Sequence, residues 1–117
     1  MKDYASMSDQ QINQLVGCKV GEVQLGARSA CCIGSDGNVL VLKGGMWTIF
    51  DPCNNPADAW PILVDNKITI DAPLPQHEYW TAEKRDTDGG LLDFHVGINP
   101  MRCAMIVFLM MKEGKND

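Results

Sequence analysis

Cysteine is the residue type in this chain with the strongest nucleophilic chemistry, and it occurs five times. Cys53 directly precedes a predicted helix, and a helix N-terminus favours the reactive thiolate form. Cys53 is therefore the candidate for a reactive thiol. The favoured alternative is structural, with Cys53 as a small, partly buried residue ahead of a helix cap. Cys31, Cys32 and Cys103 fall within apolar stretches that predict packing positions.

Metal-binding and catalytic patterns are weak in this sequence. The two histidines, His77 and His95, are far apart, and no cysteine pair has zinc-type spacing. The segment Asp86-Thr87-Asp88-Gly89 resembles the start of a calcium loop but lacks the closing glutamate, so we expect a polar hairpin turn. Phosphate-binding glycine motifs and a nucleophile elbow are also missing. We therefore expect no metal site and no cofactor, and the sequence leans away from an enzyme.

The segment DPCNNPADAW, residues 51–60, carries a clear helix start. Asn55 is a favourable N-cap, Pro56 suits the first helical position, and Asp58 places a negative charge in the first turn. One asparagine suffices for a cap, so Asn54 remains for a loop contact or for surface recognition. The predicted binding surface comprises Asn54, Asn55, Asp58 and Trp80.

The same helix contains Pro61, which removes one backbone hydrogen bond and predicts a kink. Ala57, Trp60 and Val64 recur at helical spacing and predict one apolar face, which Ile62 and Leu63 extend. We expect this face to be buried, with Trp60 directed at a sheet. The competing interpretation places the tryptophans at a surface, where grouped aromatic side chains indicate an interface.

Periodicity and caps predict three helices, near residues 9–16, 55–65 and 100–112. Ser8 and Gln11 form a capping box at the first start, and Gly17 is the predicted stop. Asp36-Gly37 predicts a two-residue hairpin turn, and Gly44-Gly45 predicts a second turn. The predicted strands cover residues 20–25, 30–33, 38–43, 46–50, 67–71, 78–83 and 92–96.

This order of elements predicts an α+β fold, with a largely antiparallel sheet and helices packed on it in an αβα-sandwich-like arrangement. The 117 residues are expected to form a single domain, 1–117, with a frayed tail at 113–117. The last helix is apolar on nearly every face, so it is either buried between layers or covered by a second subunit. A homodimer is therefore one candidate assembly.

The formal net charge of −5 disfavours nucleic-acid binding, and the ten basic residues are scattered. A basic protein partner would fit this charge better. The N-terminal residues contain no apolar signal-peptide core, and the longest apolar run, 103–111, is about half of a membrane span. We expect a cytoplasmic protein with reduced thiols and no membrane association.

Two long segments carry a family resemblance. FDPCNNPADAWPILVDNKITI, residues 50–70, and NPMRCAMIVFLMMKE, residues 99–113, resemble the NinX family of tailed-phage proteins. The resemblance implies a small protein of a lambdoid-type phage or prophage, expressed in the cytoplasm of the bacterial host. It implies no activity and supplies no catalytic residues. The order of elements is also similar to that of small phage domains with an αβα-sandwich arrangement.

The leading hypothesis is a non-enzymatic phage accessory protein that binds an unidentified host or phage protein. Small size, acidic charge and the resemblance motivate this hypothesis. One alternative is a small-molecule or nucleotide-binding domain, because the helix start at Asn55 could hold an anion. Another is a DNA-associated accessory factor, which only the resemblance suggests.

Overall fold

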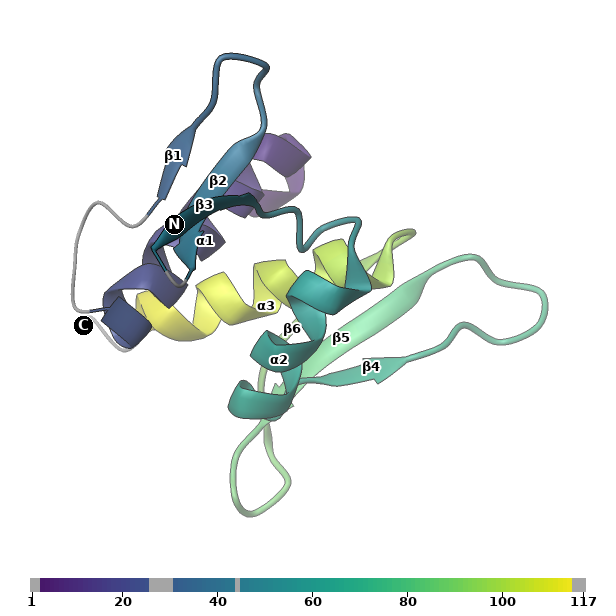
Figure 1. Cartoon of the computed structure of the whole chain (residues 1–117). Helices are drawn as coiled ribbons and strands as arrows, with labels where there is room; N and C mark the ends of the chain where they lie inside the picture. Colours follow the sequence, from purple (N-terminus) through teal and green to yellow (C-terminus); the bar gives the residue numbers. More distant parts are fainter. Residues whose placement is uncertain (1–2, 26–30, 44, 115–117) are drawn as a thin grey trace. The chain divides into compact units, whose positions relative to one another are not determined.

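The computed structural model describes residues 3–25, 31–43 and 45–114. The chain forms two compact units, Met1–Asp51 and Pro52–Asp117. Each unit combines helix with a three-stranded antiparallel sheet (Figure 1). The α+β prediction is confirmed, with the strands divided between two small sheets.

The first unit begins with a short 3-10 helix, η1 (Tyr4–Ser6), and helix α1 (Asp9–Leu25). A meander follows, formed by β1 (Cys31–Ile33), β2 (Val39–Lys43) and β3 (Met46–Ile49) in the order β1-β2-β3. Helix α1 packs against β1 and β2. The buried residues of these elements include Ile12, Val16, Val39 and Val41.

The predicted capping box starts α1 and is confirmed. The backbone N–H of Gln11 donates to Oγ of Ser8 at 3.2 Å, and the backbone N–H of Ser8 donates to Oε1 of Gln11 at 2.8 Å. The predicted stop at Gly17 is wrong, as is the strand at 20–25, because the helix continues to Leu25. A glycine inside a helix costs about 1 kcal/mol, which packing on two strands can offset.

The turn between β1 and β2 is one residue longer than predicted. The backbone N–H of Gly34 donates to the carbonyl of Asn38 at 2.8 Å, and Gly37 lies at φ +87°. The loop therefore has three residues. In hairpin loops of this length the last residue commonly adopts the left-handed conformation, as Gly37 does here. Hydrogen bonds from Asn38 lower the pKa of Asp36 and fix the loop.

Some expectations fall outside the described residues. These are the start of the first meander strand at Ala30, the contribution of Gly44 to the second turn, and the tail from residue 115. Gly45, the other residue of the second turn, lies at φ +81°, where glycine is favoured.

The second unit contains α2 (Pro56–Asn66), β4 (Thr69–Asp71), β5 (Trp80–Arg85), β6 (Leu91–Gly97) and α3 (Pro100–Gly114). Its sheet has the order β4-β5-β6. Helix α3 packs against this sheet, and α2 packs against α3, which gives three layers (Figure 1). The predicted helices near 55–65 and 100–112 are confirmed within two residues.

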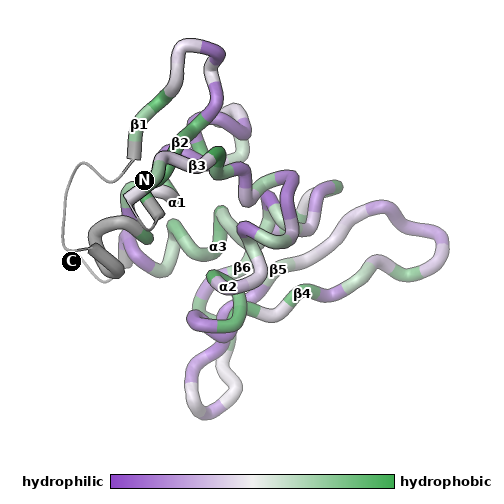
Figure 2. The backbone as a smooth tube through the Cα atoms, in the orientation of Figure 1, coloured by the Kyte–Doolittle hydropathy of each residue, from purple (hydrophilic) through white to green (hydrophobic). Residues whose placement is uncertain are grey.

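Helix α3 is the apolar centre of the second unit. The run from Cys103 to Leu109 is buried, and the hydropathy colouring shows the apolar character of the helix (Figure 2). Its approach to β6 is close, because a Cβ added at Gly97 would lie 2.9 Å from Sγ of Cys103. The burial of α3 removes the sequence-based reason for a second subunit.

Candidate functional site

The start of α2 is held by the asparagine and the aspartate that the sequence singles out. Oδ1 of Asn55 accepts the backbone N–H of Ala57 at 3.0 Å, and its Nδ2 donates to Oδ2 of Asp58 at 3.3 Å. Asn55 is therefore the N-cap of α2, as predicted. Both side chains have a structural role in starting the helix.

Asn54 takes part in a different contact, with the start of α3. Nδ2 of Asn99 donates to the carbonyl of Cys53 at 2.7 Å and lies 3.4 Å from Oδ1 of Asn54. Oδ1 of Asn99 accepts the backbone N–H groups of Met101 and Arg102 at 3.0 and 3.2 Å. We call Cys53, Asn54 and Asn99 the helix-start clasp. It gives the second asparagine of the Asn54-Asn55 pair a tertiary contact.

The thiol candidate Cys53 lies in the core, with no exposed surface. This position matches the structural alternative and keeps the sulfur away from reagents in solution. Cys103 is also buried, and this burial raises the pKa of its thiol. Burial, together with the charge of Arg102, lowers the pKa of His95. The raised pKa disfavours the nucleophilic thiolate form at Cys103.

Two tryptophans of the second unit differ in exposure, and Trp60 differs from the expectation that it is buried. Trp80 starts β5 opposite Gly97 and is half-buried. Trp60, by contrast, is 62% exposed, and Val64 on the next turn is 53% exposed. The prediction that the Ala57, Trp60 and Val64 face is buried was therefore wrong.

The opposite face of α2 is the buried one. Ala59, Ile62 and Leu63 are nearly inaccessible and belong to the side that packs on α3. We call the exposed residues Ala57, Trp60, Pro61 and Val64 the α2 outer face. Sequence reasoning missed it because α2 has apolar residues on both sides. The sequence signal available was the helical spacing of Ala59, Ile62 and Leu63.

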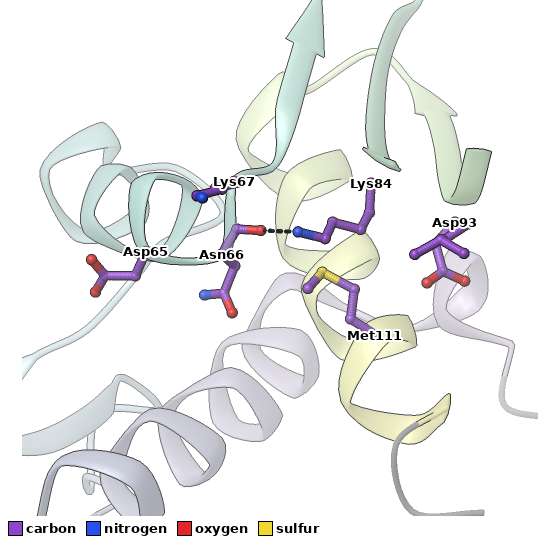
Figure 3. Close-up of a pocket in the computed structure, with 7 residues that line it drawn as sticks. Asp65, Asn66, Lys67, Lys84, Asp93 and Met111 are labelled. Atoms are coloured by element: carbon purple, nitrogen blue, oxygen red, sulfur yellow. Dashed lines mark hydrogen bonds between the residues drawn. The ribbon is translucent and has the colours of Figure 1, made fainter. Parts of the chain in front are cut away.

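A pocket of about 480 Å³ opens at the other end of α2 (Figure 3). Nζ of Lys84 donates to the carbonyl of Asn66 at 2.7 Å, so this lysine satisfies a carbonyl at the C-terminus of α2. Two lysines and two aspartates balance in charge, which gives an anion little net attraction. The pocket is lined by Asp65, Asn66, Lys67, Lys84, Leu92, Asp93 and Met111.

Within the described ranges, no group of three or more His, Cys, Asp or Glu side chains could hold a metal ion. No described helix is both long and apolar enough to cross a bilayer. The segment that resembles a calcium loop forms a hairpin turn, in which Oδ1 of Asp86 accepts the backbone N–H groups of Asp88 and Gly90 at 2.9 and 2.8 Å.

Comparison with known proteins decides the family. A model of the family described as "Bacteriophage P22, NinX" matches residues 3–112, nearly the whole chain. The chain belongs to the NinX family. This confirms the resemblance, and it places both the helix-start clasp and the α2 outer face within the NinX match.

A crystal structure of a phage protein from Bacillus cereus ATCC 14579 is similar to this NinX chain, with a TM-score of 0.60 and 14% sequence identity. The similarity covers 97% of this chain and 93% of that one. At this identity the likeness shows the fold alone. A search of curated proteins found no significant match.

Proposed function

We propose that this NinX-family chain is a non-enzymatic phage accessory protein that binds a host or phage protein through the α2 outer face, in the cytoplasm of the host. The observation that carries the proposal is the exposure of Trp60 and Val64 side by side on a helix whose other face is buried. Tryptophan is enriched among residues that contribute most to protein binding, often about 2 kcal/mol or more each.

The helix that presents Trp60 is held at both ends, which supports the proposal. Asn55 caps the N-terminus, and Lys84 bonds the carbonyl of Asn66 near the C-terminus. An anchored helix loses little conformational entropy when a partner binds. The helix-start clasp adds a further restraint just before α2.

The charges around the α2 outer face suggest the chemistry of the partner. Asp58 and Asp65 lie on the same helix as Trp60, and the chain carries a formal net charge of −5. A partner groove with an apolar floor and a basic rim would complement this surface. Binding to such a groove should weaken as salt concentration rises.

The alternatives have less support. An anion at the start of α2 would meet Asp58, and Oδ1 of Asn55 already accepts the N–H of Ala57. The pocket at the other end of α2 has balanced charges. A DNA-associated role has less support because the formal net charge of the chain is −5.

The test is affinity capture from phage-infected host lysate with tagged protein, read by mass spectrometry. Trp60→Ala is compared with Trp47→Ala, a matched control in which an exposed tryptophan of the first unit is removed. We expect a partner that Trp47→Ala retains and Trp60→Ala loses, with affinity lowered about tenfold or more. Equal capture by both variants, or no specific capture, would contradict the proposal.

A further inference from the structure

Strand β3 is an edge of the sheet in the first unit, which has the order β1-β2-β3. An edge strand has one row of backbone N–H and C=O groups that no neighbouring strand binds. All four residues of β3 are exposed, with Trp47 at 48% and Ile49 at 55%. Because successive side chains point to opposite faces, β3 is accessible from both sides of the sheet.

A single hydrogen bond fixes which backbone groups of β3 point outward. The backbone N–H of Phe50 donates to the carbonyl of Val39 at 2.8 Å. Bonded and non-bonded pairs alternate along an antiparallel ladder, so Thr48 also bonds β2, and Trp47 and Ile49 turn their N–H and C=O groups away from it. Among the described residues, none forms a hydrogen bond with these outward groups. They are therefore open to a further strand.

The side chains of the same two residues extend an apolar face of the sheet. Trp47 lies opposite Leu42, and Ile49 lies opposite Leu40. Side chains that are directly opposite share one face, and both leucines are half-buried. Val41, between the leucines, points to the other face and is buried. The outward backbone groups and an apolar side-chain face thus lie at the same two positions of β3.

We infer that the β3 edge binds an extended segment of a partner protein, which adds a fourth strand to this sheet. Its backbone would bond the outward groups of Trp47 and Ile49, and its apolar side chains at alternate positions would continue the face that these two residues share. A helix could not do this, because its main-chain groups are bonded within the helix. In strand addition, main-chain hydrogen bonds provide affinity and alternate side chains provide specificity.

The other sheet edges are less suited to strand addition. Strands β1 and β4 have three residues each. Strand β6 contains Asp93, and its pairing with β5 has a register shift at Lys84 and Arg85. Charges and bulges protect an edge from pairing, whereas β3 contains no charged residue, glycine or proline. The β3 edge is separate from the α2 outer face, and the inference stands independently of the proposed function.

The test selects short linear peptides from a displayed random library on the full chain and measures their affinity by fluorescence anisotropy. We expect the selected peptides to alternate apolar and polar residues and to lack proline. A single N-methyl group should weaken binding about tenfold at every second amide, because only alternate amides face β3, and should have little effect at the amides between. A library that yields no binding peptide, or N-methyl effects without this period of two, would overturn the inference.

Variants of the chain and hydrogen exchange locate the binding position. Ile49→Pro removes the outward N–H and leaves the ladder with β2 intact, whereas Ile49→Ala keeps this N–H and shortens the side chain. The proline variant should bind the selected peptide more weakly than the alanine variant, and Trp60→Ala should bind it like the unchanged chain. In the unchanged chain the peptide should slow amide exchange at Trp47 and Ile49, while Thr48 is protected with or without it. Equal affinities of the two Ile49 variants, loss of binding in Trp60→Ala, or unchanged exchange at Trp47 and Ile49 would each contradict strand addition at β3.

Discussion

Two helices of the second unit begin with the dipeptide Asn-Pro, and the two asparagines make different contacts. Asn55 bonds only within α2 in the contacts described above, two and three residues along the chain. Asn99 caps α3 in the same local way and also donates to the carbonyl of Cys53, 46 residues earlier. One cap starts its helix, and the other also joins two distant segments.

The comparison shows that a capping motif does not reveal its tertiary contacts. An asparagine cap uses the side-chain oxygen and leaves the amide nitrogen available. At Asn55 that nitrogen bonds the half-buried Asp58, and at Asn99 it bonds the carbonyl of a fully buried residue. The second contact should contribute more, because solvent competes with it less.

The largest effect is expected for Asn99→Ala, which removes the cap of α3 and the clasp together. Losing a cap costs about 1 kcal/mol, and losing a bond to a buried carbonyl adds about 1–2 kcal/mol. We expect the free energy of unfolding to fall by about 2–3 kcal/mol in urea denaturation. Asn99→Asp keeps the cap and lacks the donor, so its free energy of unfolding should fall by only about 1–2 kcal/mol. If Asn99→Asp were as stable as the unchanged chain, the clasp would contribute nothing.

Asn55→Ala should have a smaller effect, because it removes a local cap at an exposed position. We expect a loss of about 1 kcal/mol in the same denaturation experiment. Asn55→Asp retains an oxygen for the N–H of Ala57 and should lie within about 0.5 kcal/mol of the unchanged chain. A loss as large as that of Asn99→Ala would erase the distinction between the two helix starts.

The smallest effect is a dependence on pH near the start of α3. Burial and the charge of Arg102, whose backbone Asn99 caps, lower the pKa of His95 below its usual 6.5. The unfolded chain therefore binds a proton at His95 more readily than the folded chain does. Stability should fall as pH falls below about 6.5 and level off once the folded pKa is passed. The melting temperature, measured as a function of pH, should fall less steeply toward low pH in His95→Gln than in the unchanged chain. His77→Gln, a control at an exposed position, should keep the full dependence on pH. The same dependence in both variants would contradict the prediction for His95.

Much of the fold could be predicted because the deciding signals are local. The capping box of Ser8 and Gln11, the cap at Asn55 and the strand alternation of β6 all depend on residues within a few positions. The length of α1 could not be predicted, because contacts with β1 and β2 accompany a helix that continues past Gly17. Tertiary packing outweighed the local stop signal there.

The candidate site was harder to predict than the fold. Helix α2 carries apolar residues on two sides, and periodicity alone does not say which side meets α3. The structure buries Ile62 and Leu63 and exposes Trp60, the reverse of the expectation for Trp60. The contact of Asn54 depends on Asn99, which is 45 positions away, and no local pattern predicts it.

The closeness of β6 and α3 makes positions 97 and 103 share one small volume. A methyl group at Gly97 would sit 2.9 Å from the sulfur of Cys103, so neither position can grow alone. A larger residue on the strand requires a smaller one on the helix, whereas a larger residue on the helix cannot be offset at position 97, where glycine is already the smallest residue. Among relatives that keep this packing, the two positions are expected to covary, and a variant at either one has to be judged by what occupies the other.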